Sequence, residues 1–132
     1  MFRLASVLTM AVAATVASGA AAPAQTPEPV PMIQVTTPAD VASVQSVNDA
    51  VSALSRKVTA CVDGGRKLEI CQCSAPQELA SLRNRYDSLI KQRPAWKDQV
   101  MSYQYLDKDG RNISAVLALS TLRRQLDVLR CE

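Results

Sequence analysis

The sequence contains no histidine. This excludes the Ser-His-Asp and Cys-His catalytic arrangements in their usual form, because an imidazole is the general base in both. It also excludes zinc and copper sites with histidine ligands, and it removes the side chain that most often titrates near neutral pH. No other catalytic constellation is recognisable, so we expect a protein that is not an enzyme, with no catalytic residues, no metal and no cofactor.

Aromatic residues are also scarce, with one Trp, three Tyr and one Phe among 132 residues. A core with so few rings must rest on Leu, Val, Ile and Ala, which favours helices. Because aromatic side chains are enriched in binding hot spots, we consider Trp96, Tyr103 and Tyr105 a possible partner-contacting surface. The alternative is that these three rings simply belong to the core.

Neither positive nor negative charge is in large excess, since the formal net charge is only +3. The charged residues are interspersed rather than grouped in blocks. This composition does not favour a nucleic-acid partner.

The apolar run at the N-terminus is too short to cross a bilayer, which takes about 20 residues. Arg3 precedes an uncharged, Ala-rich stretch from Leu4 to Ala17, and small residues continue to Ala24. This pattern predicts a cleavable secretory signal peptide over 1–24, with a cut after Ala20 as the close alternative. We therefore expect a periplasmic or secreted protein with no membrane span after cleavage.

Proline is concentrated between residues 23 and 38, which hold five of the seven prolines. Few large apolar residues accompany them, so residues 25–36 are predicted to form a flexible linker of polyproline II character. The folded domain is then expected to span residues 37–132.

The first helix is predicted over residues 38–62, with Thr37 as its cap and Pro38 in its first turn. Apolar residues recur along it in steps of three and four. They are Val44, Val47, Val51, Leu54 and Val58. Such a stripe faces either the core of its own domain or a second copy in a coiled-coil homodimer.

Two more helices follow, one capped by Ser74 and ending before Pro94, the other capped by Ser120. Between them, residues 99–106 alternate in polarity, residues 107–110 carry turn chemistry, and residues 112–119 are compatible with a strand. We predict a β-hairpin there, with a helix over residues 94–105 as the alternative. The expected fold class is mainly α: a small three-helix domain with a short β-hairpin between helices 2 and 3, stapled by disulfides.

Four cysteines remain after cleavage, and an oxidising compartment makes two disulfides the expected state. They are Cys61, Cys71, Cys73 and Cys131. A bond between Cys71 and Cys73 would close a very tight ring. Two connectivities remain open: Cys61–Cys71 with Cys73–Cys131, or Cys61–Cys73 with Cys71–Cys131.

These observations predict an exported, non-catalytic binding or structural protein with an unknown protein or envelope component as its partner. One alternative is a thiol–disulfide redox protein that uses Cys71 and Cys73. A second alternative is an oligomeric envelope spacer in which the first helix forms a coiled coil.

Overall fold

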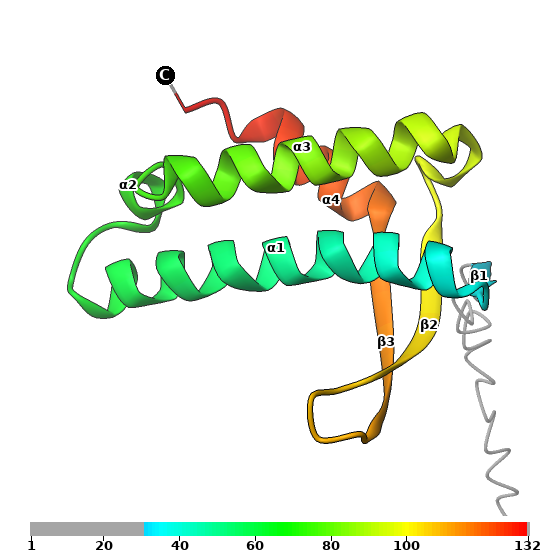
Figure 1. Ribbon diagram of the computed structural model, residues 1–132. Coiled ribbons are helices and arrows are strands. Elements are labelled where there is room, and N and C mark those ends of the chain that lie inside the picture. Colours follow the sequence, from blue (N-terminus) through cyan, green and yellow to red (C-terminus); the bar gives the residue numbers. More distant parts are fainter. Residues whose placement is uncertain (1–30, 132) are drawn as a thin grey trace, which may run out of the picture.

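A computed structural model describes residues 31–131. The predicted signal peptide and residues 25–30 of the predicted linker lie outside the described residues. The described part is mainly helical, with four α-helices, a three-stranded sheet and two disulfides (Figure 1). In chain order its elements are β1 (Met32–Val35), α1 (Pro38–Asp63), α2 (Leu68–Gln72), α3 (Pro76–Gln92), a 3-10 turn (Pro94–Trp96), β2 (Val100–Leu106), β3 (Asn112–Ala118) and α4 (Leu119–Val128).

The two long helices, α1 and α3, lie side by side and antiparallel (Figure 1). Pro38 stands in the first turn of α1, where its missing N–H leaves no helical hydrogen bond unmade. Thr37 precedes the helix in an extended conformation, but its side chain makes no capping hydrogen bond. The helix ends at Asp63, and Gly65 supplies a left-handed residue at φ 90° just beyond it.

The structure corrects the expected three helices and single hairpin in two places. Residues 68–72, expected to be part of a plain connection, form the short helix α2. Residues 32–35, within the range predicted as linker, form β1, which pairs in parallel with β2. Neither segment is long enough to show a periodic pattern; β1 is held by its pairing with β2, and α2 by the bond between Cys71 and Cys61.

Two expected helix caps are also corrected. The hydroxyl of Ser74 donates to the carbonyl of Cys71 at 2.7 Å instead of capping α3, which begins at Pro76. Ser120 lies inside α4, because the helix begins one residue earlier, at Leu119. In both cases the helix begins directly at an apolar or proline residue after a loop or strand.

The predicted hairpin is present and excludes the alternative helix over residues 94–105. β2 and β3 pair antiparallel in an unbroken register from Val100 opposite Ala118 to Leu106 opposite Asn112. The Asp107 carboxylate closes the turn by accepting hydrogen bonds from two backbone N–H groups, each at 2.8 Å. Gly110 has φ 75°, a conformation that costs glycine little.

The core lies between the helices and one face of the sheet. The stripe considered for a homodimer contributes directly to it, since Val44 and Val47 are at most 1% exposed and Leu54 is 8% exposed. Val51 and Val58 are half-buried against the same cluster. The coiled-coil alternative is therefore not supported, because the side chains that it needs pack within their own domain.

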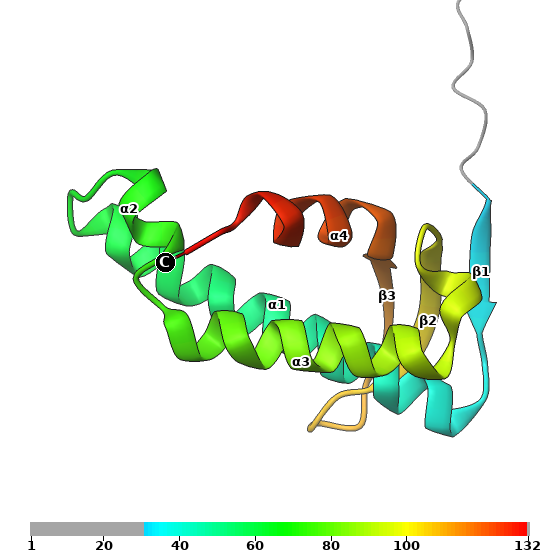
Figure 2. The same cartoon turned by 90° about the horizontal axis from the view of Figure 1, so that it is seen from above.

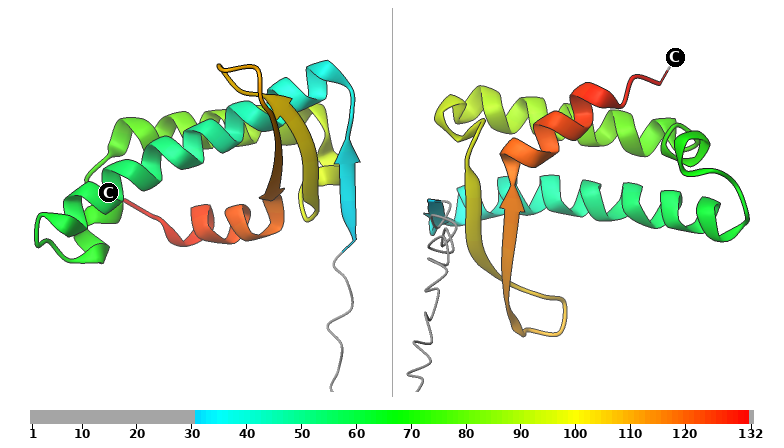
Figure 3. Two further views of the ribbon diagram at one scale, coloured as in Figure 1. Left: turned by 90° about the horizontal axis from the view of Figure 1, so that it is seen from below. Right: turned by 180° about the vertical axis from the view of Figure 1, so that it is seen from behind.

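The sheet crosses α1 near its N-terminal end, as the view from behind shows (Figure 3). Met101, Tyr103 and Leu117 point into the core, whereas the alternate residues Gln104 and Val116 are exposed. One face of the sheet is thus covered by helices, and the other carries exposed side chains.

Candidate functional site: a groove beside two disulfides

Two disulfides lie at the end of the molecule remote from the sheet. Cys61 bonds to Cys71, with 5.5 Å between their Cα atoms, and Cys73 bonds to Cys131, with 5.4 Å. This is the first of the two connectivities left open by the sequence. The bonds join the end of α1 to α2, and the residue after α2 to the end of the chain.

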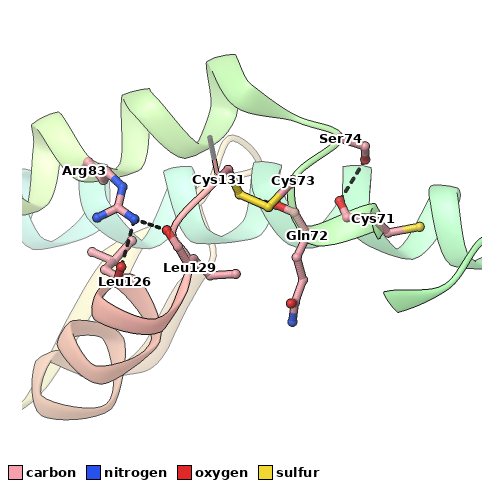
Figure 4. The surroundings of a disulfide bond; sticks show 8 residues. All are labelled: Cys71, Gln72, Cys73, Ser74, Arg83, Leu126, Leu129 and Cys131. Atoms are coloured by element: carbon pink, nitrogen blue, oxygen red, sulfur yellow. Dashed lines mark hydrogen bonds between the residues drawn. A yellow bond between two sulfur atoms is a disulfide. The ribbon is translucent and has the colours of Figure 1, made fainter. Parts of the chain in front are cut away.

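The two cysteines of the Cys71-Gln72-Cys73 segment thus belong to different bridges and differ in accessibility. Cys71 is fully buried, whereas Cys73 is exposed. Figure 4 shows Cys73 and Cys131 joined beside the end of α4.

Arg83 of α3 holds the end of α4 in place. One terminal nitrogen of its guanidinium donates to the carbonyl of Leu126 at 2.8 Å and also to the carbonyl of Leu129 (Figure 4). These carbonyls lie at the C-terminal end of the helix, where they lack helical partners and where the helix dipole favours a cation. α4 is therefore attached to α3 by this arginine and, through Cys131, to α2.

An open groove of about 570 Å³ lies between α1, α2 and α4. Leu54 and Val58 line it from α1, Gln72 from α2, and Arg124, Val128 and Leu129 from α4 and its end. Val128 is 80% exposed. Arg124 is the one charged residue among those that line the groove.

The three aromatic residues predicted as a partner surface do not line this groove. Tyr103 is only 3% exposed and belongs to the core. Its hydroxyl donates to Oε1 of Gln45 at 2.6 Å and accepts from Nδ2 of Asn48 at 2.8 Å. Burial raises the pKa of Tyr103 above its usual value of 10.0.

The other two rings of that set are half-buried against the core. The Tyr105 ring centre lies 5.9 Å from that of Tyr103. Trp96 lies under the Arg93 guanidinium, 5.5 Å from the ring centre. Part of each ring therefore packs against the core of the domain.

A fourth aromatic residue, Tyr86 of α3, is also buried. Its hydroxyl has no hydrogen-bond partner among the described residues. Burial raises the pKa of Tyr86 as well. This hydroxyl is an uncompensated polar group in the core, which costs stability.

No pattern in the sequence indicated the groove. Arg124 and Val128 lie on α4 outside the inward stripe of Leu122 and Leu126, which are 5% and 4% exposed. The available signal was an apolar valine on a face otherwise occupied by polar residues. A single residue of this kind is common on protein surfaces and was not informative by itself.

Within residues 31–131, no group of three or more Cys, Asp or Glu side chains is arranged to hold a metal ion. None of the helices in this range combines the length and the apolar character that crossing a membrane requires.

No protein-family model, curated protein or solved structure matches this chain.

Proposed function

We propose that this protein is an exported, non-catalytic binding module of the cell envelope, located in the periplasm or secreted. Its partner is a protein, bound at the groove between α1, α2 and α4. The observation that carries the proposal is the position of the groove beside both disulfides: Gln72, which lines it, lies between Cys71 and Cys73, and these two cysteines tie the C-terminal end of α2 to Cys61 near the end of α1 and to Cys131.

Covalent restraint favours binding because it limits the motion that a partner must suppress. A site whose walls are already fixed loses less conformational entropy when it is occupied. Here two bridges and the Arg83 contacts fix the three helices that line the groove. Removing the exposed Val128 side chain from water would then lower the free energy of the complex.

Export is supported by two independent features. Residues 1–24 have the charge, apolar run and small residues of a cleavable signal. Two disulfides are stable in an oxidising compartment and uncommon in a reducing one. Sequencing the N-terminus of the protein purified from its native host tests this part. We expect a start at Ala21 or Gln25, and a product retaining Met1 would contradict export.

Site-specific photo-crosslinking in the native host tests the binding proposal. A photoreactive amino acid replaces Thr59, an exposed residue of the groove, and, in a control variant, Asp87, an exposed residue of α3. We expect a discrete protein adduct from position 59 and none from position 87. Equal adducts from both positions, or none from either, would refute a partner at the groove.

A further inference from the structure

The strand β3 has a free edge. The sheet order is β1-β2-β3, so β3 pairs on one side with β2 and has no strand on its other side within residues 31–131. The strand is seven residues long, has a regular register and contains neither charge nor proline. Natural proteins usually protect such edges with charges, prolines, bulges or short strands. β1, at the opposite edge, is only four residues long and lies between Pro31 and Pro38.

The register identifies the backbone groups at this edge. Leu119 donates its N–H to the carbonyl of Gln99, and Asp107 donates to that of Arg111, so odd-numbered residues of β3 face β2. In an antiparallel pair the alternate residues point their N–H and C=O groups away from the partner strand. At the free edge these belong to Asn112, Ser114, Val116 and Ala118.

The helices limit what can pair with this edge. α1 has 26 residues and is therefore about 39 Å long, whereas three strands spaced about 4.8 Å apart span only about 10 Å. Figures 1 and 2 show α1 and α4 extending past β3 on the side away from β1. The free edge therefore lies beside helices that project beyond the sheet.

This overhang does not suit a second copy of the chain. Two copies of β3 paired antiparallel would be related by a two-fold axis perpendicular to the sheet, so both sets of helices would lie on the same face. The projecting helices of each copy would then occupy the same space. A single extended segment carries no helical layer and does not meet this obstacle.

The groove lies near the C-terminal end of β3 and contains one cationic side chain. Thr121, which lines the groove, follows Ala118 by three residues, so one end of the groove lies close to the end of β3. Arg124 lines it and forms no ion pair with any described residue. A carboxylate on the bound segment would pair with this exposed guanidinium.

Together these features lead to an inference that rests on the proposed function and specifies its partner. We propose that the free edge of β3 binds an extended segment of another protein as a fourth strand, and that this segment carries a carboxylate that pairs with Arg124. Backbone hydrogen bonds to the edge supply affinity, and alternate side chains directed toward the groove supply selectivity.

The experiment uses a probe selected for the purpose. A random twelve-residue peptide library displayed on phage is selected against the mature wild-type protein, and the dissociation constants of the enriched peptides are measured by calorimetry. We expect peptides with alternating apolar residues and an acidic residue or free C-terminus. Failure to enrich any peptide would overturn the inference.

The decisive variant is Ser114→Pro, with Ser114→Ala as its control. The N–H of Ser114 points to the free edge, so proline removes one outward donor and leaves the hydrogen bonds between β2 and β3 in place. We expect Ser114→Pro to weaken peptide binding about tenfold or more, and Ser114→Ala to change it less than about twofold. Equal affinities for the two variants would refute strand addition.

A second measurement does not depend on the folding of the proline variant. Methylating the backbone nitrogens of the selected peptide at alternate positions blocks one set of its N–H groups at a time. We expect one set to abolish binding to the wild-type protein and the other to leave it nearly unchanged, because only one edge of an added strand faces β3. Insensitivity to both sets would contradict the inference.

The charge requirement is tested with Arg124→Gln and, as a control on an exposed lysine outside the groove, Lys97→Gln. Peptide affinity should fall about tenfold only in the first variant, and a peptide with Gln in place of its acid should bind both variants equally. Dimerisation of the wild type that is lost in Ser114→Pro would instead identify a second copy as the occupant. If crosslinks from position 59 persist while every peptide test fails, the proposed function stands and the strand addition does not.

Discussion

Removing the disulfide between Cys73 and Cys131 should be among the most destabilising changes outside the core. The bridge joins residues 58 positions apart. Restricting the unfolded chain over a loop of that length is worth about 4 kcal/mol in a chain-entropy treatment. A domain of this size is typically stable by only about 5–15 kcal/mol. Cys73→Ala combined with Cys131→Ala should therefore remove a large share of the stability.

Accessibility makes this bridge a clean perturbation. Cys73 is exposed and Cys131 is half-buried, so alanine at both positions leaves little cavity in the core. The other bridge closes a loop of only 10 positions, worth about 3 kcal/mol by the same treatment. Because Cys71 is fully buried, removing that bridge adds a packing loss. Removing the bridge between Cys73 and Cys131 thus measures mainly the loss of restraint on the unfolded chain, without a large loss of packing.

Urea unfolding provides the assay. Trp96 is the single tryptophan and is half-buried, so its fluorescence should follow the loss of the fold. The double variant should unfold at lower urea concentration, with a free energy of unfolding reduced by about 4 kcal/mol. A reduction below about 1 kcal/mol would show that the bridge hardly restrains the unfolded chain, and would refute the argument from loop length. Wild-type protein with both bridges intact is the reference.

Five further substitutions and one pH titration test other parts of the structure. Tyr86→Phe should leave the free energy of unfolding unchanged or raise it, because its buried hydroxyl has no partner, whereas Tyr103→Phe should lower it by about 1–2 kcal/mol through two lost hydrogen bonds. Because the pKa of Tyr103 is raised in the folded state, the side chain is protonated in both the folded and the unfolded state below about pH 10, and the unfolded state loses its proton first as the pH rises. The free energy of unfolding should therefore fall above about pH 10, which urea titrations at several pH values would measure. In Tyr103→Phe that fall should be smaller, and an identical pH profile would contradict the assignment. Gly110→Ala should cost about 1 kcal/mol because alanine is strained at φ 75°, and a neutral result by the same assay would show that the turn relaxes. Leu122→Ala should cost about 2–5 kcal/mol in the core, while Val128→Ala at the exposed groove should cost less than about 0.5 kcal/mol; similar losses would argue against the burial described.

Local chemistry in the sequence was sufficient for the elements with strong patterns. The stripe from Val44 to Val58 predicted α1 because a 3.6-residue period brings these side chains to one face. Alternation in residues 99–106 and the Asp107 turn predicted the hairpin for the same kind of reason. The terminus of α3 before Pro94 followed from the missing N–H of proline.

The short elements and the groove could not be predicted from local sequence patterns. β1 is four residues and α2 five, so neither contains enough repeats to show a period. Arg124 and Val128 are unremarkable in sequence and acquire a role only beside Leu54 and Val58, about 70 positions earlier in the chain. That proximity depends on the path of the chain between α1 and α4.

The sequence by itself determined the absence of histidine chemistry and the helices and hairpin whose periods are written in local residue order, and its pattern over residues 1–24 predicts export. The tertiary structure alone decided which cysteines pair, whether the stripe on α1 faces its own core, and which edge of the sheet stays free. The physical reason is range. Period and turn chemistry act between residues a few positions apart, whereas disulfide pairing and burial depend on which distant segments the packed core brings together.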